Sequence, residues 1–210
     1  MDYHKEKLFN FVLPKIINIK NPIILELGVR EGKSTKMFID LVEKNNGQLI
    51  SIDINDYGYL FKSKNWKFIK SRDDNFELIL KQIQNKLDVI FIDTTHEASH
   101  VINIIENYYL KLKQGGYIFI DDVSWLPYLK NKERNNLYCE INNKETFEVI
   151  LNLYNNNELN FDLEYSFVSS GFACLKKKNN NKLNSLKKIK TREFSLANFL
   201  RKIKNFLFEK

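Results

Sequence analysis

Apolar and polar residues alternate along the chain in blocks that predict strands and helices in turn. Short apolar runs typical of buried strands occur at residues 23–27, 49–53, 66–69, 87–93 and 117–123. Segments with apolar residues at helical spacing separate them, at residues 34–44, 76–84 and 99–112. Because alternation of this kind requires crossover connections, it predicts a doubly wound α/β domain whose mostly parallel sheet is covered on both faces.

Two more strands are expected near the end of this domain, at residues 161–167 and 171–175. Only three residues separate them, too few for a crossover helix, so they predict an antiparallel hairpin at the sheet edge. The sheet would then have seven strands. Asn142 and Asn143 are expected to cap a helix that runs through Phe147 and Tyr154.

The sequence patterns at the two ends of the chain differ from the strand–helix alternation of this central part. Residues 1–20 hold an amphipathic helix, the domain spans residues 21–175, and residues 176–190 form a Lys/Asn-rich linker with little to bury. Beyond the linker, an apolar helical stripe is flanked by basic residues. It contains Phe194, Ala197, Leu200, Ile203 and Leu207, with Phe199 and Phe206 beside them.

Composition and charge narrow the possible functions. Hydrophobic residues make up 43% of the chain, which excludes disorder as a whole, and two cysteines cannot form a disulfide framework. No apolar run approaches the length of a membrane span, so a cytoplasmic location is expected. The net charge of +7 comes from residues 176–210, which carry 12 basic and two acidic side chains, whereas the rest of the chain is slightly acidic.

The basic tail allows several partners. It suits peripheral contact with an anionic membrane at its inner face through residues 192–210. The apolar stripe of the tail could equally dock on the chain's own domain, or on a second subunit in a homo-oligomer. Nucleic acid is the least favoured partner, because the body is acidic and the tail has no groove-reading motif.

The turn after the first strand is the first candidate binding element. It comprises Glu26, Gly28, Gly32 and Ser34 with their neighbours, and it opens a helix. Glycines allow a ligand close to the backbone, and a helix start offers unpaired N–H groups. A Walker A loop needs four residues between its first glycine and Gly-Lys-Ser, and here only three intervene. The G-x-G-x-x-G fingerprint is also absent, because position 30 is arginine. A ligand without phosphates therefore fits the turn better.

The ends of the second and third strands carry further acidic residues. Asp53 ends the second strand and suits two hydrogen bonds from vicinal ribose hydroxyls, although a solvated strand end is the alternative. Asp73 and Asp74 follow the third strand, where a nucleoside base would lie if Asp53 held the ribose. Either of them would equally well cap the next helix.

The fourth and fifth strands end in Asp93 and in Asp121-Asp122. Adjacent parallel strands lie about 4.8 Å apart, so the three carboxylates are expected to converge, and Mg²⁺ or another divalent cation would relieve their repulsion. The alternative is that one caps a loop while the others are solvated. His96 follows Asp93 by three residues and could take a proton from a hydroxyl polarised by that ion, although a polar surface residue is the alternative for a single loop histidine. His100 is expected to be structural or solvated.

These motifs together resemble class I S-adenosylmethionine-dependent methyltransferases, and more narrowly the metal-dependent group of macrocin-type sugar O-methyltransferases and cephalosporin-hydroxylase-like proteins. The resemblance covers about residues 20–175 and implies a Rossmann-like fold. It implies that the first turn and Asp53 hold S-adenosylmethionine, and that Asp93, Asp121 and Asp122 bind the metal. His96, with Asp93, would then be catalytic.

The resemblance implies methyl transfer to a hydroxyl of a sugar or a similar small diol. A catechol-like phenol is the alternative acceptor, and a non-catalytic cofactor-binding protein is the alternative function. Residues 124–140 lack strong periodicity and carry Trp125, Tyr128 and Tyr138. We expect them to form part of a lid over the acceptor, because aromatic rings suit a sugar face.

Overall fold

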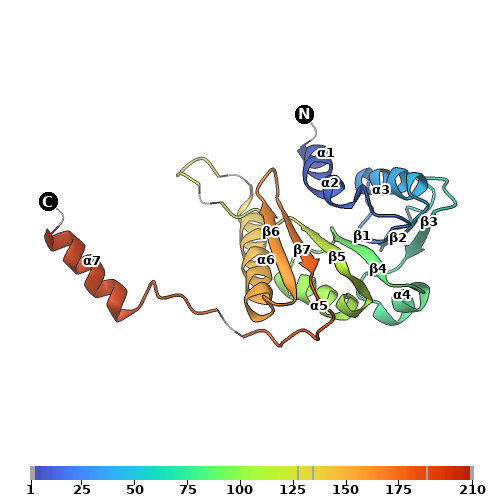
Figure 1. Ribbon diagram of the computed structural model, residues 1–210. Coiled ribbons are helices and arrows are strands. Elements are labelled where there is room, and N and C mark those ends of the chain that lie inside the picture. Colours follow the sequence, from blue (N-terminus) through green and yellow to red (C-terminus); the bar gives the residue numbers. More distant parts are fainter. Residues whose placement is uncertain (1–2, 127, 134, 188, 209–210) are drawn as a thin grey trace.

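The computed structural model describes residues 3–126, 128–133, 135–187 and 189–208 (Figure 1). Within them, one sheet has the strand order β3-β2-β1-β4-β5-β7-β6. Strands β1 to β5 pair in parallel, whereas β7 runs antiparallel to both β5 and β6. The predicted doubly wound sheet with an antiparallel C-terminal hairpin is confirmed. The strands are β1 (Ile23–Leu27), β2 (Gln48–Asp53), β3 (Trp66–Lys70), β4 (Leu87–Ile92), β5 (Leu112–Asp121), β6 (Phe161–Ser166) and β7 (Phe172–Lys177).

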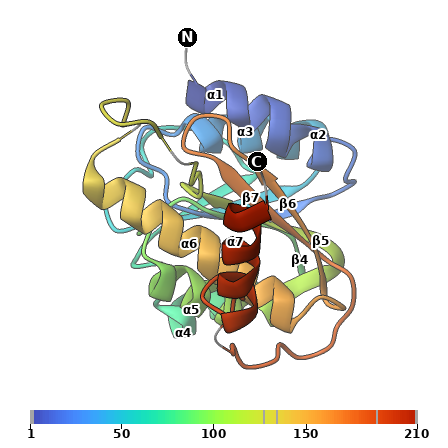
Figure 2. The same ribbon diagram turned by 90° about the vertical axis from the view of Figure 1, so that its left-hand side faces the viewer.

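Helices cover both faces of the sheet (Figures 1 and 2). One face carries α1 (Tyr3–Lys7), a π-helical segment (Leu8–Val12), α2 (Leu13–Ile16) and α3 (Lys33–Lys44). The other face carries α4 (Phe76–Gln82), α5 (Ala98–Tyr108) and α6 (Leu137–Asn156). Each face has its own apolar core, because alternate strand residues point to opposite sides of a sheet. Strands β1, β2 and β4 are buried on both sides, as their continuous apolar runs predicted, whereas the edge strand β3 is partly exposed.

The N-terminal helix is less regular than its sequence suggests. A single amphipathic helix was expected, but a π-helical turn over Leu8–Val12 interrupts it. A π turn changes the angular spacing of side chains. Lys7 and Leu8 are neighbours in the sequence, and both are buried, with exposed fractions of 2% and 0%. The side chain of Lys7 thus lies in the interior and not in the solvent.

Several boundaries differ from the prediction. The helix predicted to start at Asn142 or Asn143 begins at Leu137, where the side chain of Asn136 accepts a hydrogen bond from the Cys139 amide. Asn136 satisfies the free N–H groups of the first turn, so the two later asparagines lie inside the helix. Strand β7 continues to Lys177, past the expected domain boundary, and Leu183 and Leu186 of the predicted linker pack on the core.

The last helix, α7 (Leu196–Phe208), lies apart from the sheet domain (Figure 1). Its apolar stripe stays exposed, from 39% at Ile203 to 87% at Phe206. Docking of the stripe on the chain's own domain is thus not seen. No helix in the described part of the chain combines the length and the hydropathy required to cross a bilayer. Positions 1–2, 127, 134, 188 and 209–210 of the predicted N-terminal helix, lid, linker and tail lie outside the described residues.

Candidate functional site

Two adjoining clefts open at the carboxyl ends of the parallel strands. One, of about 440 Å³, lies between the turn after β1 and the ends of β4 and β5. The other, of about 400 Å³, lies between the ends of β1, β2 and β3. Both are lined by Gly28, Arg30, Asp93 and Thr94, so they form one continuous depression. This is the edge of a doubly wound sheet where ligands bind.

The turn after β1 requires a glycine at its first position. Gly28 has a φ of +95°, and a Cβ there would lie 1.9 Å from the carbonyl oxygen of Asp93. Arg30 also has a positive φ, +47°. The turn therefore keeps a left-handed residue at position 30, where the G-x-G fingerprint has glycine, although the side chain is an arginine. Gly32, with a φ of +75°, caps α3, and a Cβ there would meet the ring of Phe61 at 2.7 Å.

Glu26 lies beneath this turn and not on the cleft wall. Its side chain is fully buried and accepts hydrogen bonds from Ser34 (2.6 Å), Thr35 (2.9 Å) and Ser51 (2.6 Å). Burial raises the pKa of Glu26 to about 7, against the lowering effect of the three hydroxyls. Of the residues predicted to bind the cofactor, Glu26 therefore supports the turn from behind, and Ser34 is both its partner and part of the cleft lining.

Asp53 joins the end of β2 to the same turn. Its Oδ2 accepts hydrogen bonds from the amides of Val29 (2.9 Å) and Arg30 (3.3 Å), and its Oδ1 accepts one from Asn55 (2.9 Å). The carboxylate thus fixes the backbone of the turn while it lines the cleft. A solvated strand end, the alternative interpretation, does not describe this arrangement.

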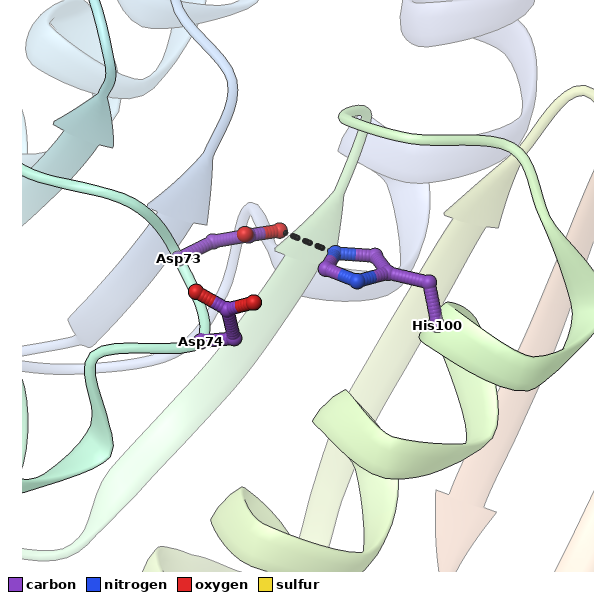
Figure 3. Close-up of side chains that lie close together, drawn as sticks. All are labelled: Asp73, Asp74 and His100. Atoms are coloured by element: carbon purple, nitrogen blue, oxygen red, sulfur yellow. Dashed lines mark hydrogen bonds and ion pairs between the residues drawn. The ribbon is translucent and has the colours of Figure 1, made fainter.

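Asp73 and Asp74 behave differently from each other. Nε2 of His100 lies 2.7 Å from Oδ2 of Asp73 (Figure 3). The hydroxyl of Thr94 donates to the same oxygen at 2.6 Å, and Asp73 lines the cleft. Asp74 turns to Arg72, whose guanidinium binds it through two nitrogens and lowers the pKa of that carboxyl. His100 thus has the structural role expected of it, and it orients Asp73.

His96 lies between two carboxylates on the cleft wall. Its Nε2 is 3.3 Å from Oδ2 of Asp122 and 3.7 Å from Oδ1 of Asp93. Asp122 reaches this position with a φ of +58°, a left-handed conformation that costs about 1 kcal/mol in a residue with a side chain. Burial, and then the nearby carboxylates of Asp121 and Asp122, raise the pKa of Asp93 well above its ordinary value. The sequence predicted that Asp93, His96 and Asp122 converge, and the three side chains lie side by side in the structure.

Asp121 has a partner that the sequence did not reveal. The ammonium group of Lys7 binds Oδ1 of Asp121, and it donates to the hydroxyl of Ser170 at 2.5 Å. The amide of Asp122 donates to the same Oδ1 at 2.7 Å. Lys7 lies 114 residues from Asp121 in the chain, on a helix whose pattern gave no sign of a buried charge. Ser170 lies in the link between β6 and β7, and only its place beside a predicted strand could have drawn attention to it.

The predicted metal ligands do not form a compact trio. Among the described residues, the group of three whose potential ligand atoms all lie within 4.8 Å of one another is Asp73, Asp74 and His100. Asp93 and Asp122 face the cleft with His96 near both of them, which suits a cation. In this arrangement Asp121 does not fit the role of metal ligand, because Lys7 already supplies a positive charge to Oδ1.

A third cleft, of about 420 Å³, continues from the first at Ser170. It is lined by Trp125, Tyr128 and the start of α6, within the segment expected to cover the acceptor. Lys144 lies over the Trp125 ring, 5.0 Å from its centre. Tyr138, also expected there, is 65% exposed and does not line this cleft.

Comparisons with known proteins concern the sheet domain that carries these clefts. Residues 25–123, from β1 to just beyond β5, match a family model described as a methyltransferase domain. A protein of Acanthamoeba polyphaga mimivirus, Uncharacterized protein R132, is 30% identical over 118 residues. The match covers 49% of this chain and 53% of that protein, so the chain spans about half the length of this relative.

Two solved structures that are described as methyltransferases share the fold of this chain. MycE, a methyltransferase of the mycinamycin biosynthetic pathway crystallised with Mg and SAH, aligns with a TM-score of 0.65 and 15% identity over 87% of this chain and 54% of its own. The chain has a class I methyltransferase fold. A Staphylococcus aureus protein described as a caffeoyl-CoA O-methyltransferase aligns with a TM-score of 0.60 and 18% identity over 84% of both chains.

The expected resemblance to class I methyltransferases is thereby confirmed, with Asp93, His96, Asp121 and Asp122 inside or at the edge of the matched domain. The N-terminal helix that carries Lys7 lies outside it. The methyltransferase fold accounts for the position of the clefts, whereas the residues that line them decide the chemistry.

Proposed function

We propose that this protein is an S-adenosylmethionine-dependent O-methyltransferase whose acceptor is a hydroxyl of a sugar or a similar small diol. The observation that carries the proposal is the continuity of the clefts. The glycine turn and Asp53 line one side of the depression, and His96 with its two carboxylates lines the other. A donor and an acceptor bound there would meet beside His96.

The donor would occupy the clefts at the ends of β1 and β2. The backbone of Gly28 and the α3 start would face its amino-acid part, Asp53 its ribose and Asp73 its base. When bound, S-adenosylmethionine supplies a methyl group on a positively charged sulfur. The acidic lining of the clefts suits a cation better than a phosphate, which also disfavours a nucleoside triphosphate.

His96 would take the proton of the acceptor hydroxyl. When Nε2 holds its proton toward Asp122, Nδ1 is the basic nitrogen of the ring. The carboxylates of Asp93 and Asp122 favour the positively charged imidazolium that results. The oxygen, freed of its proton, would form the new bond to the methyl carbon, and the methyl–sulfur bond would break. Alignment by the cleft walls contributes several kcal/mol to such a reaction.

The acceptor would occupy the third cleft. Its lining mixes aromatic rings with polar groups, as Trp125, Tyr128, Asn135 and Glu140 illustrate. Rings of this kind pack on the apolar face of a sugar, and polar groups bind its hydroxyls. A catechol-like phenol would use the same rings and is the second candidate.

Activity towards a panel of acceptors tests the proposal. The full-length protein would be incubated with methyl-labelled S-adenosylmethionine and with simple sugars, nucleotide-linked sugars and catechols. Label on a sugar oxygen supports the proposal, and label on a phenol oxygen favours the second candidate. Cofactor binding without transfer to any of them would favour the non-catalytic alternative, and label on nitrogen or carbon would contradict O-methylation.

We also propose that α7 lies on an anionic membrane surface. Its exposed apolar stripe includes Phe199, Leu200 and Ile203, and Arg201, Lys202 and Lys204 flank it. A helix with one apolar face and basic neighbours binds at the boundary between lipid headgroups and acyl chains. The lysine-rich segment before it adds attraction to acidic lipids.

A further inference from the structure

Lys7 is a buried cation at the reaction end of the sheet. Its side chain is 1% exposed, and it lies 4.6 Å from the centre of the Phe172 ring. Removing an ammonium group from water costs several kcal/mol unless charged partners replace the water. Asp121 and the Ser170 hydroxyl are those partners. A charged residue thus stands at a buried position that packing alone would fill with an apolar residue.

The ends of β4 and β5 need a positive charge. Asp93, Asp121 and Asp122 lie close enough for their charges to influence one another, and Glu26 adds a carboxyl group beneath them. A divalent cation is one means of relieving such repulsion. Lys7 is another, because its ammonium already contacts Oδ1 of Asp121. A bound ion and this ammonium would compete for the same carboxylate.

We infer that Lys7 is the resident cation of this site and takes the place of a divalent metal at Asp121. The inference rests on the proposed methyl transfer for its functional meaning. Lys7 is a positioning residue, because it does not line the clefts and acts through Asp121. Asp121 in turn accepts the Asp122 amide, and Asp122 lies beside His96.

Metal binding without any substrate tests this inference separately from the proposed function. Mn²⁺ would be titrated into the full-length protein, with free Mn²⁺ followed by electron paramagnetic resonance. The wild type is expected to bind weakly, Lys7→Met to bind at least tenfold more tightly, and Lys7→Met/Asp121→Asn to lose that gain. Lys15→Met makes the same change at a half-exposed lysine of α2 and should leave Mn²⁺ affinity unchanged. Tight binding by the wild type that Lys7→Met leaves unaltered would overturn the inference.

A second measurement uses the wild type alone, so it does not depend on whether Lys7→Met folds. Reductive methylation followed by mass spectrometry reports how accessible each lysine is. Lys7 should react at least tenfold more slowly than the exposed Lys5 of the same helix, both with and without millimolar Mg²⁺. Equal rates, or rapid labelling of Lys7 once Mg²⁺ is added, would show that the ammonium is not a resident cation. Neither readout requires S-adenosylmethionine, so the proposed function can fail while this inference stands.

Discussion

The ring nitrogen Nε2 of His96 lies 3.3 Å from Oδ2 of Asp122, on the wall of a cleft that the glycine turn also lines. The backbone of Asp122 is left-handed, and a conformation of this kind persists only where its surroundings hold it. The amide of Asp122 donates to Asp121, and the ammonium group of Lys7 binds the same carboxylate. A chain of contacts thus runs from the N-terminal helix to the proposed base.

Replacing His96 should separate chemistry from binding. His96→Gln removes the proton acceptor but keeps a polar side chain, so the methyl-transfer rate should fall about 10²- to 10⁴-fold. Affinity for S-adenosylhomocysteine should change by less than about twofold, since His96 does not line the cleft assigned to ribose and base. His100→Gln is the contrasting variant, because His100 holds Asp73, and it should weaken cofactor binding first. Equal rates for wild type and His96→Gln would contradict the assigned role.

Gly28 should not tolerate a side chain. Gly28→Ala places a Cβ 1.9 Å from the Asp93 carbonyl, so either the turn or the end of β4 must move. We expect a loss of about 2 kcal/mol or more in the free energy of unfolding, and loss of cofactor binding. Gly115→Ala is the matched control, because Gly115 has a φ of +81° but no atom within 4 Å of a Cβ.

Urea denaturation and calorimetry of the two glycine variants measure the difference. Gly115→Ala should lose only about 1 kcal/mol, the cost of a left-handed alanine, and should bind the cofactor normally. If both variants behaved alike, close packing between the turn and β4 would not be what requires glycine at position 28.

The fold class followed from the sequence because buried parallel strands leave continuous apolar runs, and loops too short for a helix imply a hairpin. The acidic strand ends could be predicted to lie together for the same reason, and Asp93, His96 and Asp122 do so. Lys7 could not be predicted. Its partners, Asp121 and Ser170, lie more than 100 positions away in the chain, and no local pattern records such contacts.

The direction in which the Glu26 side chain points could not be predicted from the sequence either. A glutamate that opens a glycine turn can face a ligand or the interior, and only the positions of Ser34, Thr35 and Ser51 show that it faces inward. The start of α6 was misplaced for a related reason. Several asparagines stand near that boundary, and the cap is the one whose side chain reaches the free amides, Asn136.

Glu26 should make stability depend on pH. Its pKa is raised from 4.5 to about 7, so the folded chain keeps a proton that the unfolded chain has released. Stability from this group is therefore complete below about pH 4.5 and is lost as the pH rises to about 7, by roughly 3 kcal/mol. Glu26→Gln stays neutral and should flatten that slope in urea denaturation between pH 5 and about 8.

Glu43→Gln is the control for this pH dependence, because it makes the same change at an exposed position of α3. It should keep the wild-type slope. Parallel slopes for wild type and Glu26→Gln would mean that the buried carboxyl does not hold its proton in the folded chain.

Two variants that add the same negative charge to different faces of α7 test whether its apolar stripe binds a membrane. Ile203→Glu places a carboxylate in the apolar stripe, and Asn205→Glu adds the same charge on the opposite face of the helix. Sedimentation of the full-length protein with vesicles rich in anionic lipid should drop about tenfold for Ile203→Glu and much less for Asn205→Glu. Equal losses would indicate a purely electrostatic attraction, and no binding by the wild type would remove the proposal.

The central claim is that the clefts beside Gly28 and Asp53 hold S-adenosylmethionine. Titration calorimetry of the full-length protein with S-adenosylhomocysteine tests it most directly, since no acceptor is needed. One molecule should bind per chain, saturably, and Asp53→Ala should weaken binding at least about tenfold, because it removes the carboxylate that holds the turn. Absence of binding by folded wild-type protein, or binding that Asp53→Ala leaves unchanged, would contradict it.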